Sequence, residues 1–156
     1  MNLPRKLLIF ALDRQLHAVG LEAVERVIRA VAITPLPEAP PAVSGIINVQ
    51  GEIVPVFDLR RRFGQAGRAV RVRDQMVLVR TAHRRVALVA NEVRGVVECS
   101  EDELAGPERI APGLALVKGV LRMDEELAVI YDPENFLTSD ELLALDQAIN
   151  GMGDES

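Results

Sequence analysis

The chain has 156 residues and a formal charge of -5 at neutral pH; 49% of its residues are hydrophobic and only 3% are aromatic. This length suits one ordinary domain, or two very small subdomains that share a core, and the core must be aliphatic. The acidic balance argues against a nucleic-acid-binding protein, because affinity for phosphates comes mainly from an excess of Lys and Arg.

The single cysteine, Cys99, excludes an internal disulfide framework and any site with several thiolate ligands, as is typical of a reducing compartment. The apolar run at residues 7–12 is too short for an export signal and has no small-residue cleavage site after it. No segment approaches the length that a bilayer-spanning helix needs. We therefore expect a soluble, cytoplasmic protein without direct insertion into a membrane.

The first predicted element is a β-hairpin. Residues 7–12 and 16–19 are apolar runs, and Asp13-Arg14 between them predicts a tight turn. From residue 21 to residue 31 the apolar side chains follow a helical spacing, but the end of this segment is rich in β-branched residues. We predict a short helix that passes into a strand.

A second hairpin is predicted in the middle of the first half of the chain. Its apolar runs, residues 46–49 and 53–59, are separated by Gln50-Gly51-Glu52. Pro55 cannot donate a hydrogen bond to a ladder, so the second strand should have an edge or a bulge there. The following residues, 65–74, are rich in Gly and Arg without an apolar period and predict a linker or loop.

Both hairpin patterns occur twice. Residues 8–27 align with residues 77–96 at an offset of 69, and the second hairpin recurs at an offset of 74, where Asp58 matches Asp132. Two copies of this unit predict a mainly β fold of two small barrels side by side, which share a hydrophobic seam.

The end of the second copy is followed by Thr138-Ser139-Asp140-Glu141, the pattern of a capping box that opens a final helix. The predicted organisation is a single domain at residues 1–150, with a first barrel at approximately 7–64, a second barrel at approximately 75–137 and a C-terminal helix at 139–149, followed by a disordered tail at 151–156.

The sequence contains no recognisable catalytic motif. It has no glycine loop for phosphates, no paired CxxC and no nucleophile elbow. His17 and His83 have no Cys, Asp or second His at ligand spacing, which favours packed or surface histidines over metal ligands or general bases. Asp58 and Asp132 are predicted to cap turns. We therefore predict no enzymatic activity, no metal site and no cofactor.

Two features leave alternatives open. Arg60, Arg61 and Arg62, together with arginines at 68, 71 and 73, are either a solvated strand end and loop or a contact for a partner. The four matched valines at 24, 27, 93 and 96 either line a groove for an amphipathic helix or belong to the core between the barrels.

The central segment also carries a family resemblance. Its Leu36-Pro37, Pro40, Gly45, Asn48, Gly51, Pro55 and Asp58-Leu59 resemble the signature of the CheW-like coupling proteins of bacterial chemosensory arrays. The resemblance implies two SH3-like five-stranded β-barrels and a non-enzymatic adaptor at membrane-associated receptor arrays. Its partners would be the regulatory domain of a CheA-type histidine kinase, the cytoplasmic tip of chemoreceptors and other CheW-like proteins in rings.

The resemblance also implies contact residues. Those assigned to the receptor are Val24, Val27, Asn48, Gln50, Val93 and Val96. Those assigned to the kinase are Gly45, Gly51, Ile53 and Pro55.

Two positions depart from the family pattern. The pattern has an arginine where this chain has Gln50, and many members have a glutamate where it has Arg26. The hypothesis is that the protein serves a divergent receptor or a parallel chemosensory system. Alternatives are a CheW-like scaffold without kinase control and a small-barrel nucleic-acid-binding protein.

Overall fold

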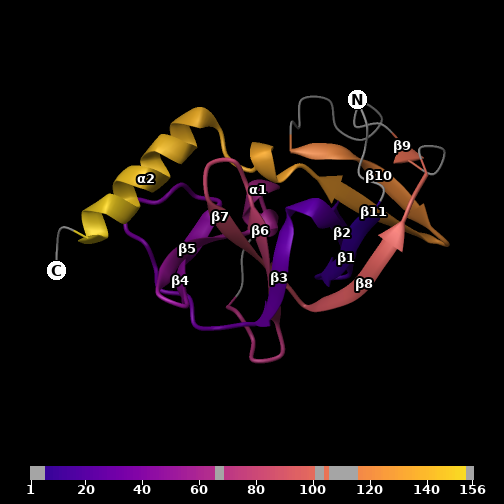
Figure 1. Cartoon of the computed structure of the whole chain (residues 1–156), viewed down its shortest axis with the longest axis horizontal. Helices are drawn as coiled ribbons and strands as arrows, with labels where there is room; N and C mark the ends of the chain where they lie inside the picture. Colours follow the sequence, from indigo (N-terminus) through magenta and orange to yellow (C-terminus); the bar gives the residue numbers. More distant parts are fainter. Residues whose placement is uncertain (1–5, 66–68, 101–103, 106–115, 154–156) are drawn as a thin grey trace.

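The computed structural model describes residues 6–65, 69–100, 104–105 and 116–153 (Figure 1). Two curled β-sheets lie side by side, and a C-terminal helix extends along one end of the molecule (Figure 1). The prediction of a mainly β fold is confirmed. No helix in the described ranges is long and apolar enough to cross a membrane.

We call the two sheets barrel A and barrel B. Barrel A has the strand order β8-β1-β2-β11-β10-β9, with β8 Glu92–Glu98, β1 Lys6–Leu12, β2 Gln15–Gly20, β11 Glu126–Tyr131, β10 Val117–Met123 and β9 Leu104–Ala105. Barrel B has the order β3-β6-β7-β5-β4, with β3 Val24–Arg29, β6 Gln75–Arg80, β7 Arg85–Ala90, β5 Glu52–Phe57 and β4 Val43–Val49. The short helices are η1 Leu21–Ala23, α1 Leu59–Arg62 and η4 Pro133–Asn135, and the long helix α2 is Ser139–Gly153.

Each barrel has five long strands and a short closing contact. In barrel A the closing contact is β9, which pairs with β10. In barrel B the equivalent contact is a bridge between Thr34 and Ile46, with two backbone hydrogen bonds of 2.8 and 2.9 Å. The predicted number of strands per barrel is therefore confirmed.

The barrels do not follow the two sequence copies. Barrel B consists of β3 to β7, which is one continuous piece of chain, whereas barrel A combines β1 and β2 with β8 to β11. The predicted division into residues 7–64 and 75–137 is therefore wrong. Its physical cause is pairing over a long sequence distance: β1 pairs with β8, and β2 runs parallel to β11.

The alternating side chains of a central strand enter two different cores. In β1, Leu7 and Ile9 point into barrel A, while Leu8 and Phe10 point into the core between the barrels. Strand β6 divides its residues in the same way between barrel B and the core between the barrels. We call this shared core the seam. Both faces of these strands are buried, which explains their nearly continuous apolar sequences.

The two first-half hairpins turn as predicted. Asp13 and Arg14 have φ of 50° and 70°, and Gln50 and Gly51 have φ of 50° and 88°, the positive values that two-residue hairpin turns require. The Asn48 side-chain oxygen accepts a 2.8 Å hydrogen bond from the Gly51 backbone N–H, so Asn48 stabilises the second turn.

Pro55 lies where β5 has an unpaired edge. The ladder between β5 and β7 contains only Val56 opposite Ala87 and Phe57 opposite Leu88. Pro55 precedes the first pair by one residue, so its missing N–H removes no bond of this ladder. The expectation of an edge at this position is confirmed.

The helical spacing at residues 21–31 has a different cause from the one expected. The helix η1 has only three residues, and the rest of the segment is mainly strand. In β3 the register with β6 shifts between Val24 and Arg26, so one extra residue forms a bulge. Because of this bulge, Val24 and Val27 face the seam although they are three residues apart.

Helix α2 begins with the predicted capping box. The Thr138 hydroxyl accepts a hydrogen bond from the Glu141 N–H (3.1 Å), and the Glu141 carboxylate accepts one from the Thr138 N–H (2.8 Å). The helix runs through Gly153, so the predicted end at residue 149 is wrong. Residues 151–153 of the predicted tail are helical, and 154–156 lie outside the described residues.

The three consecutive arginines hold separate parts of the fold together. Arg60 is buried and contacts Asp58 (3.2 Å) and Asp13 (3.1 Å), which joins α1 to the turn between β1 and β2. Arg62 binds Glu141 at 2.8 Å and so fixes the start of α2. The sequence left open whether these arginines are solvated or contact a partner. Arg60 and Arg62 instead bind carboxylates within the fold. Residue 68 lies outside the described residues, while Arg71 and Arg73 are exposed.

Gly45 is required by the closure of barrel B. Its φ is 155°, and a Cβ atom at this position would lie 2.4 Å from the Thr34 carbonyl oxygen. That oxygen accepts the hydrogen bond from Ile46 that closes the barrel.

Replacing Gly45 with Ala should therefore destabilise the fold by about 2 kcal/mol or more, because backbone atoms must move to remove the clash. Gly51→Asn is a matched control with a smaller expected cost, since no atom lies within 4 Å of its added Cβ and Asn tolerates positive φ. Urea unfolding of both variants tests this. Equal losses of stability would contradict the closure role of Gly45.

Candidate functional site

Four valines lie in equivalent pairs on β3 and β8. In β8 the register with β1 shifts as it does in β3, so Val93 and Val96 lie opposite two seam residues of β1. Val24, Val27 and Val93 are partly buried against the seam, whereas Val96 is 49% exposed. The valines thus combine the two alternatives from the sequence: they extend the seam and reach the surface.

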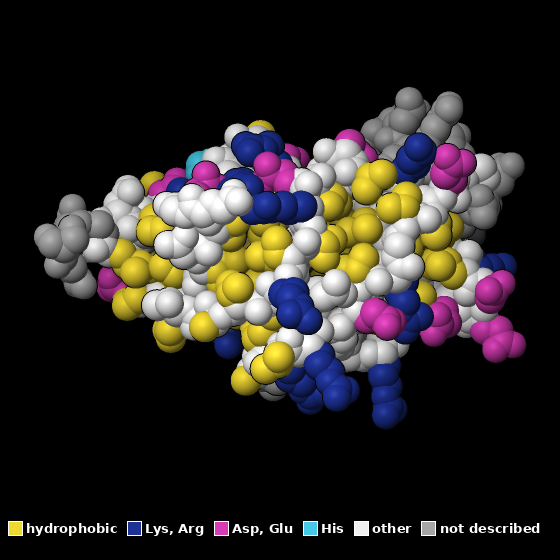
Figure 2. Space-filling view, turned by 60° about the horizontal axis from the view of Figure 1, so that its bottom comes forward, with side chains coloured by type: hydrophobic (Ala, Val, Ile, Leu, Met, Phe, Trp, Pro, Cys, Tyr) yellow, Lys and Arg dark blue, Asp and Glu magenta, His cyan; other side chains and the backbone are white. Residues whose placement is uncertain are grey.

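One face of the molecule carries an apolar band. Figure 2 views the molecule from the side where β3 and β8 lie in Figure 1, and hydrophobic side chains form a band across this face. Lys and Arg side chains gather below the band, with acidic side chains mainly toward one end (Figure 2). This combination of an apolar band and a charged border is suited to binding another protein.

Four charged residues form a network at one end of barrel B, which we call the rim network. Glu25 on β3 accepts hydrogen bonds from Arg80 (3.0 Å) and from Arg85 Nε. Arg85 at the start of β7 also donates to Glu52 at the start of β5 (2.8 Å). The hydrogen bond from Arg85 holds the pKa of the Glu25 carboxyl below its ordinary value.

Arg26 and Gln50 do not form a pair. Both are exposed, and within the described residues no hydrogen bond or ion pair joins them. Arg26 lies opposite Leu78, which points into barrel B, so Arg26 is on the other face of β3 from Val24 and Val27. The two departures from the family pattern therefore do not compensate each other by a direct contact in the unbound protein.

The residues assigned to the kinase divide into two groups. Gly45 and Pro55 are buried and have no side-chain surface to offer a partner. Gly51 is exposed at the hairpin turn, and Ile53 beside it is 42% exposed. Leu127 is the equivalent residue of the hairpin between β10 and β11, and it is 53% exposed.

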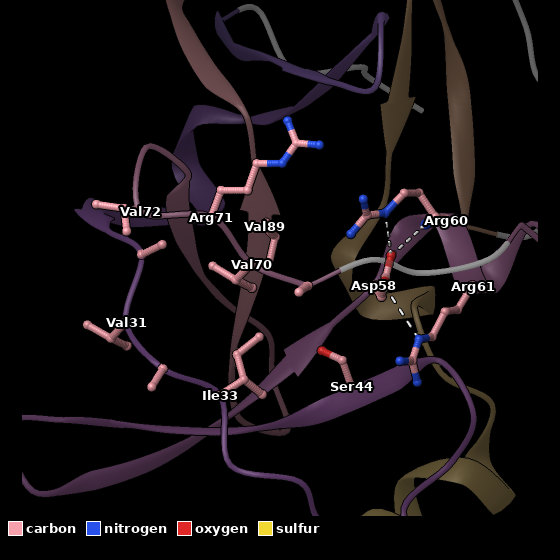
Figure 3. Close-up of a pocket in the computed structure, with 13 residues that line it drawn as sticks. Val31, Ile33, Ser44, Asp58, Arg60, Arg61, Val70, Arg71, Val72 and Val89 are labelled. Atoms are coloured by element: carbon pink, nitrogen blue, oxygen red, sulfur yellow. Dashed lines mark hydrogen bonds and ion pairs between the residues drawn. The ribbon is translucent and has the colours of Figure 1, made fainter.

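A cavity of about 580 Å³ opens at the side of barrel B (Figure 3). Val31, Val70 and Val72 line one wall, and Asp58 faces it from the other (Figure 3). The Asp58 carboxylate caps α1 through the Arg60 N–H (2.9 Å) and also contacts the Arg60 and Arg61 side chains. This supports the predicted capping role. The sequence did not reveal the cavity, because its walls come from strands, a helix and loops that are far apart in the chain.

The second matched aspartate has the same role. Asp132 accepts a 3.1 Å hydrogen bond from the Glu134 N–H and caps η4. Within the described ranges, no group of three or more His, Cys, Asp or Glu side chains could hold a metal ion.

The two histidines have packing and surface positions, as predicted. His83 is exposed and lies 2.9 Å from Asp146 of α2. His17 is buried, stacks on Phe10 and has its Nδ1 2.7 Å from the Tyr131 hydroxyl. Burial lowers the pKa of His17 to about 4 and raises that of Tyr131.

Acid should destabilise the fold through His17. Because its pKa is lower in the folded state than its ordinary value of 6.5, the unfolded chain takes up this proton first as pH falls. The stability present at pH 7 should decrease by about 3 kcal/mol between roughly pH 6.5 and pH 4 from this group alone. Urea unfolding of wild type and His17→Phe at several pH values measures the difference. Identical pH dependence of the two proteins would contradict the assignment.

Comparison with known proteins places this geometry in a family. The model of the CheW-like domain matches residues 6–141. The chain belongs to the CheW-like family. The resemblance drawn from the central segment is confirmed.

Relatives with this domain match over most of their length. The chain is 23% identical over 146 residues to the chemotaxis protein CheW of Treponema pallidum, with 90% of this chain and 86% of the relative covered. It is 26% identical over 132 residues to the chemotaxis protein CheW of Thermotoga maritima, with 85% and 87% covered.

A solved structure agrees in fold. The crystal structure of the scaffolding protein TtCheW from Thermoanaerobacter tengcongensis superimposes with a TM-score of 0.77 and 27% sequence identity. The match covers 89% of this chain and 96% of TtCheW. The predicted CheW-like architecture of two SH3-like barrels is confirmed.

Proposed function

We propose that this protein is a non-enzymatic adaptor that couples methyl-accepting chemoreceptors to a CheA-type histidine kinase. The observation that carries the proposal is the CheW-like domain over residues 6–141, combined with two separate exposed surfaces on it. An adaptor of this kind works in the cytoplasm at membrane-associated receptor arrays. It needs binding surfaces and no reactive group.

The receptor surface is formed by the matched valines of β3 and β8, which lie at the border of the seam. The receptor tip is a helical hairpin, and an amphipathic helix binds by placing its apolar side chains on such a surface. The matched valines Val24, Val27, Val93 and Val96 supply contacts from both barrels. Gln50 at the hairpin turn adds a polar contact, while Asn48 acts indirectly because its side chain stabilises that turn.

The kinase surface is the exposed tip of the hairpin between β4 and β5. Ile53 and Gly51 contact the regulatory domain of the kinase, and Gly45 and Pro55 support this hairpin from inside the barrel. Simultaneous binding of both partners raises the effective concentration of kinase near receptor. The regulatory domains of the kinase, whose fold is similar to that of this protein, then alternate with CheW-like proteins in rings.

An Ile53→Asp variant should lose about tenfold or more in affinity for the kinase regulatory domain, because a carboxylate replaces an apolar contact. Leu127→Asp is the matched control, since it makes the same change at the equivalent position of the other hairpin. Calorimetric titration with the regulatory domain measures both. Equal affinities of wild type and Ile53→Asp would refute this kinase surface, and absence of binding by wild type would refute the kinase coupling.

Arg26, which has no ion pair among the residues that the structure describes, and the uncharged Gln50 favour a divergent receptor or a parallel chemosensory system. Without a charge at position 50, hydrogen bonds to a polar receptor tip are roughly half as strong as charge-assisted bonds. The double variant Arg26→Glu with Gln50→Arg should therefore change affinity for the protein's own receptor fragment several-fold. Unchanged binding would remove the basis for this specificity.

A further inference from the structure

The two ends of the rim network lie beside the two proposed surfaces. Glu25 is the extra residue of the β3 bulge, next to Val24. Glu52 follows the turn Gln50-Gly51 and directly precedes Ile53. The network therefore connects the segment proposed to contact the receptor with the segment proposed to contact the kinase.

Arg85 is the residue that joins these segments. It donates to Glu25 on β3 and to Glu52 on β5, and only 18% of its side chain is exposed. In the strand order β3-β6-β7-β5, this one side chain from β7 reaches strands on both sides of it, across β6. Arg80 differs, because within the described part of the chain its side chain binds Glu25 alone, and 62% of that side chain is exposed.

The backbone pairing around these two segments is irregular, so the contacts of Arg85 can affect their position. The bulge orients Val24 and Val27 toward the seam, and a bulge interrupts the regular ladder at that point. The hairpin tip is held by the ladder between β4 and β5, which ends at Val49 opposite Glu52, and by the Asn48 side chain at its turn. On its other side, β5 pairs with β7 only at Val56 and Phe57. The backbone pairing is thus incomplete beside both segments, and Arg85 makes side-chain contacts to both of them.

We infer that Arg85 is a positioning residue through which occupation of the receptor surface on β3 changes the affinity of the hairpin tip for the kinase. The inference rests on the proposed function. A partner that fixes Glu25 also restrains Arg85 and Glu52, so the second partner binds a tip that is already ordered. Within the described residues, Arg26 and Gln50 supply no ion pair between these segments, and Arg85 supplies the ionic connection.

Hydrogen–deuterium exchange of the full chain tests the connection without any partner. In Arg85→Gln, exchange should become faster at residues 49–53 and at residues 24–27 together, because one donor to each segment is lost. Arg80→Gln is the matched control: it also removes a hydrogen bond to Glu25, and it should leave exchange at residues 49–53 unchanged. Equal exchange at the hairpin tip in wild type and Arg85→Gln would overturn the inference.

Binding measurements test the coupling itself. The probes are a receptor tip fragment and the kinase regulatory domain from the same organism, and the quantity is the receptor affinity with and without saturating regulatory domain. Wild type should show roughly two- to fivefold tighter receptor binding in the presence of the regulatory domain, the size expected for a partly exposed ionic contact. Arg85→Gln should show a ratio of about one, and Arg80→Gln should keep the wild-type ratio.

The outcomes separate the two proposals. If wild type binds neither probe, the proposed function fails, while the exchange experiment still decides whether Arg85 connects the segments. If wild type binds both probes and the Arg85→Gln ratio equals that of wild type, the proposed function stands and the coupling role of Arg85 is overturned.

Discussion

The burial of both faces of the central strands is the constraint on which this structure depends. Each barrel alone is small, and its strands would leave one apolar face in water. In β1 and β6, alternate side chains fill a barrel interior and the seam, so the two barrels complete each other. The buried pair His17 and Tyr131 lies in this same shared region, where His17 Nδ1 and the Tyr131 hydroxyl are hydrogen-bonded.

The surface proposed for binding follows from the same arrangement. Bulges in β3 and β8 turn pairs of valines toward the seam at its outer border, where they are only partly covered. The rim network and the hairpin tip lie at the end of barrel B that includes the β3 bulge. The two surfaces proposed for binding, and the rim network proposed to link them, thus follow from the way the barrels pack and close.

The sequence predicted the features that depend on neighbouring residues. The hairpin turns, the capping box at Thr138 and the caps at Asp58 and Asp132 follow from local chemistry, and the structure contains all of them. The order of the strands did not follow, because the pairing of β1 with β8 joins residues far apart in the chain. Apolar residues spaced by three favoured a helix, since a bulge gives a strand the same spacing. The internal roles of Arg60 and Arg62 were missed for the same reason: their partners come from other parts of the chain.

Barrel A is built from strands at the two ends of the described chain, and this affects how the protein can fold during synthesis on the ribosome. Strands β3 to β7 can form barrel B as soon as they have emerged, whereas the hairpin of β1 and β2 emerges first and lacks its partners β8 and β11 until much later. During that interval the side chains that point into barrel A, such as Leu7 and Ile9, lack their partners on β10 and β11. The nascent hairpin therefore has to be shielded, by the early barrel or by a chaperone, before the last strands enclose it.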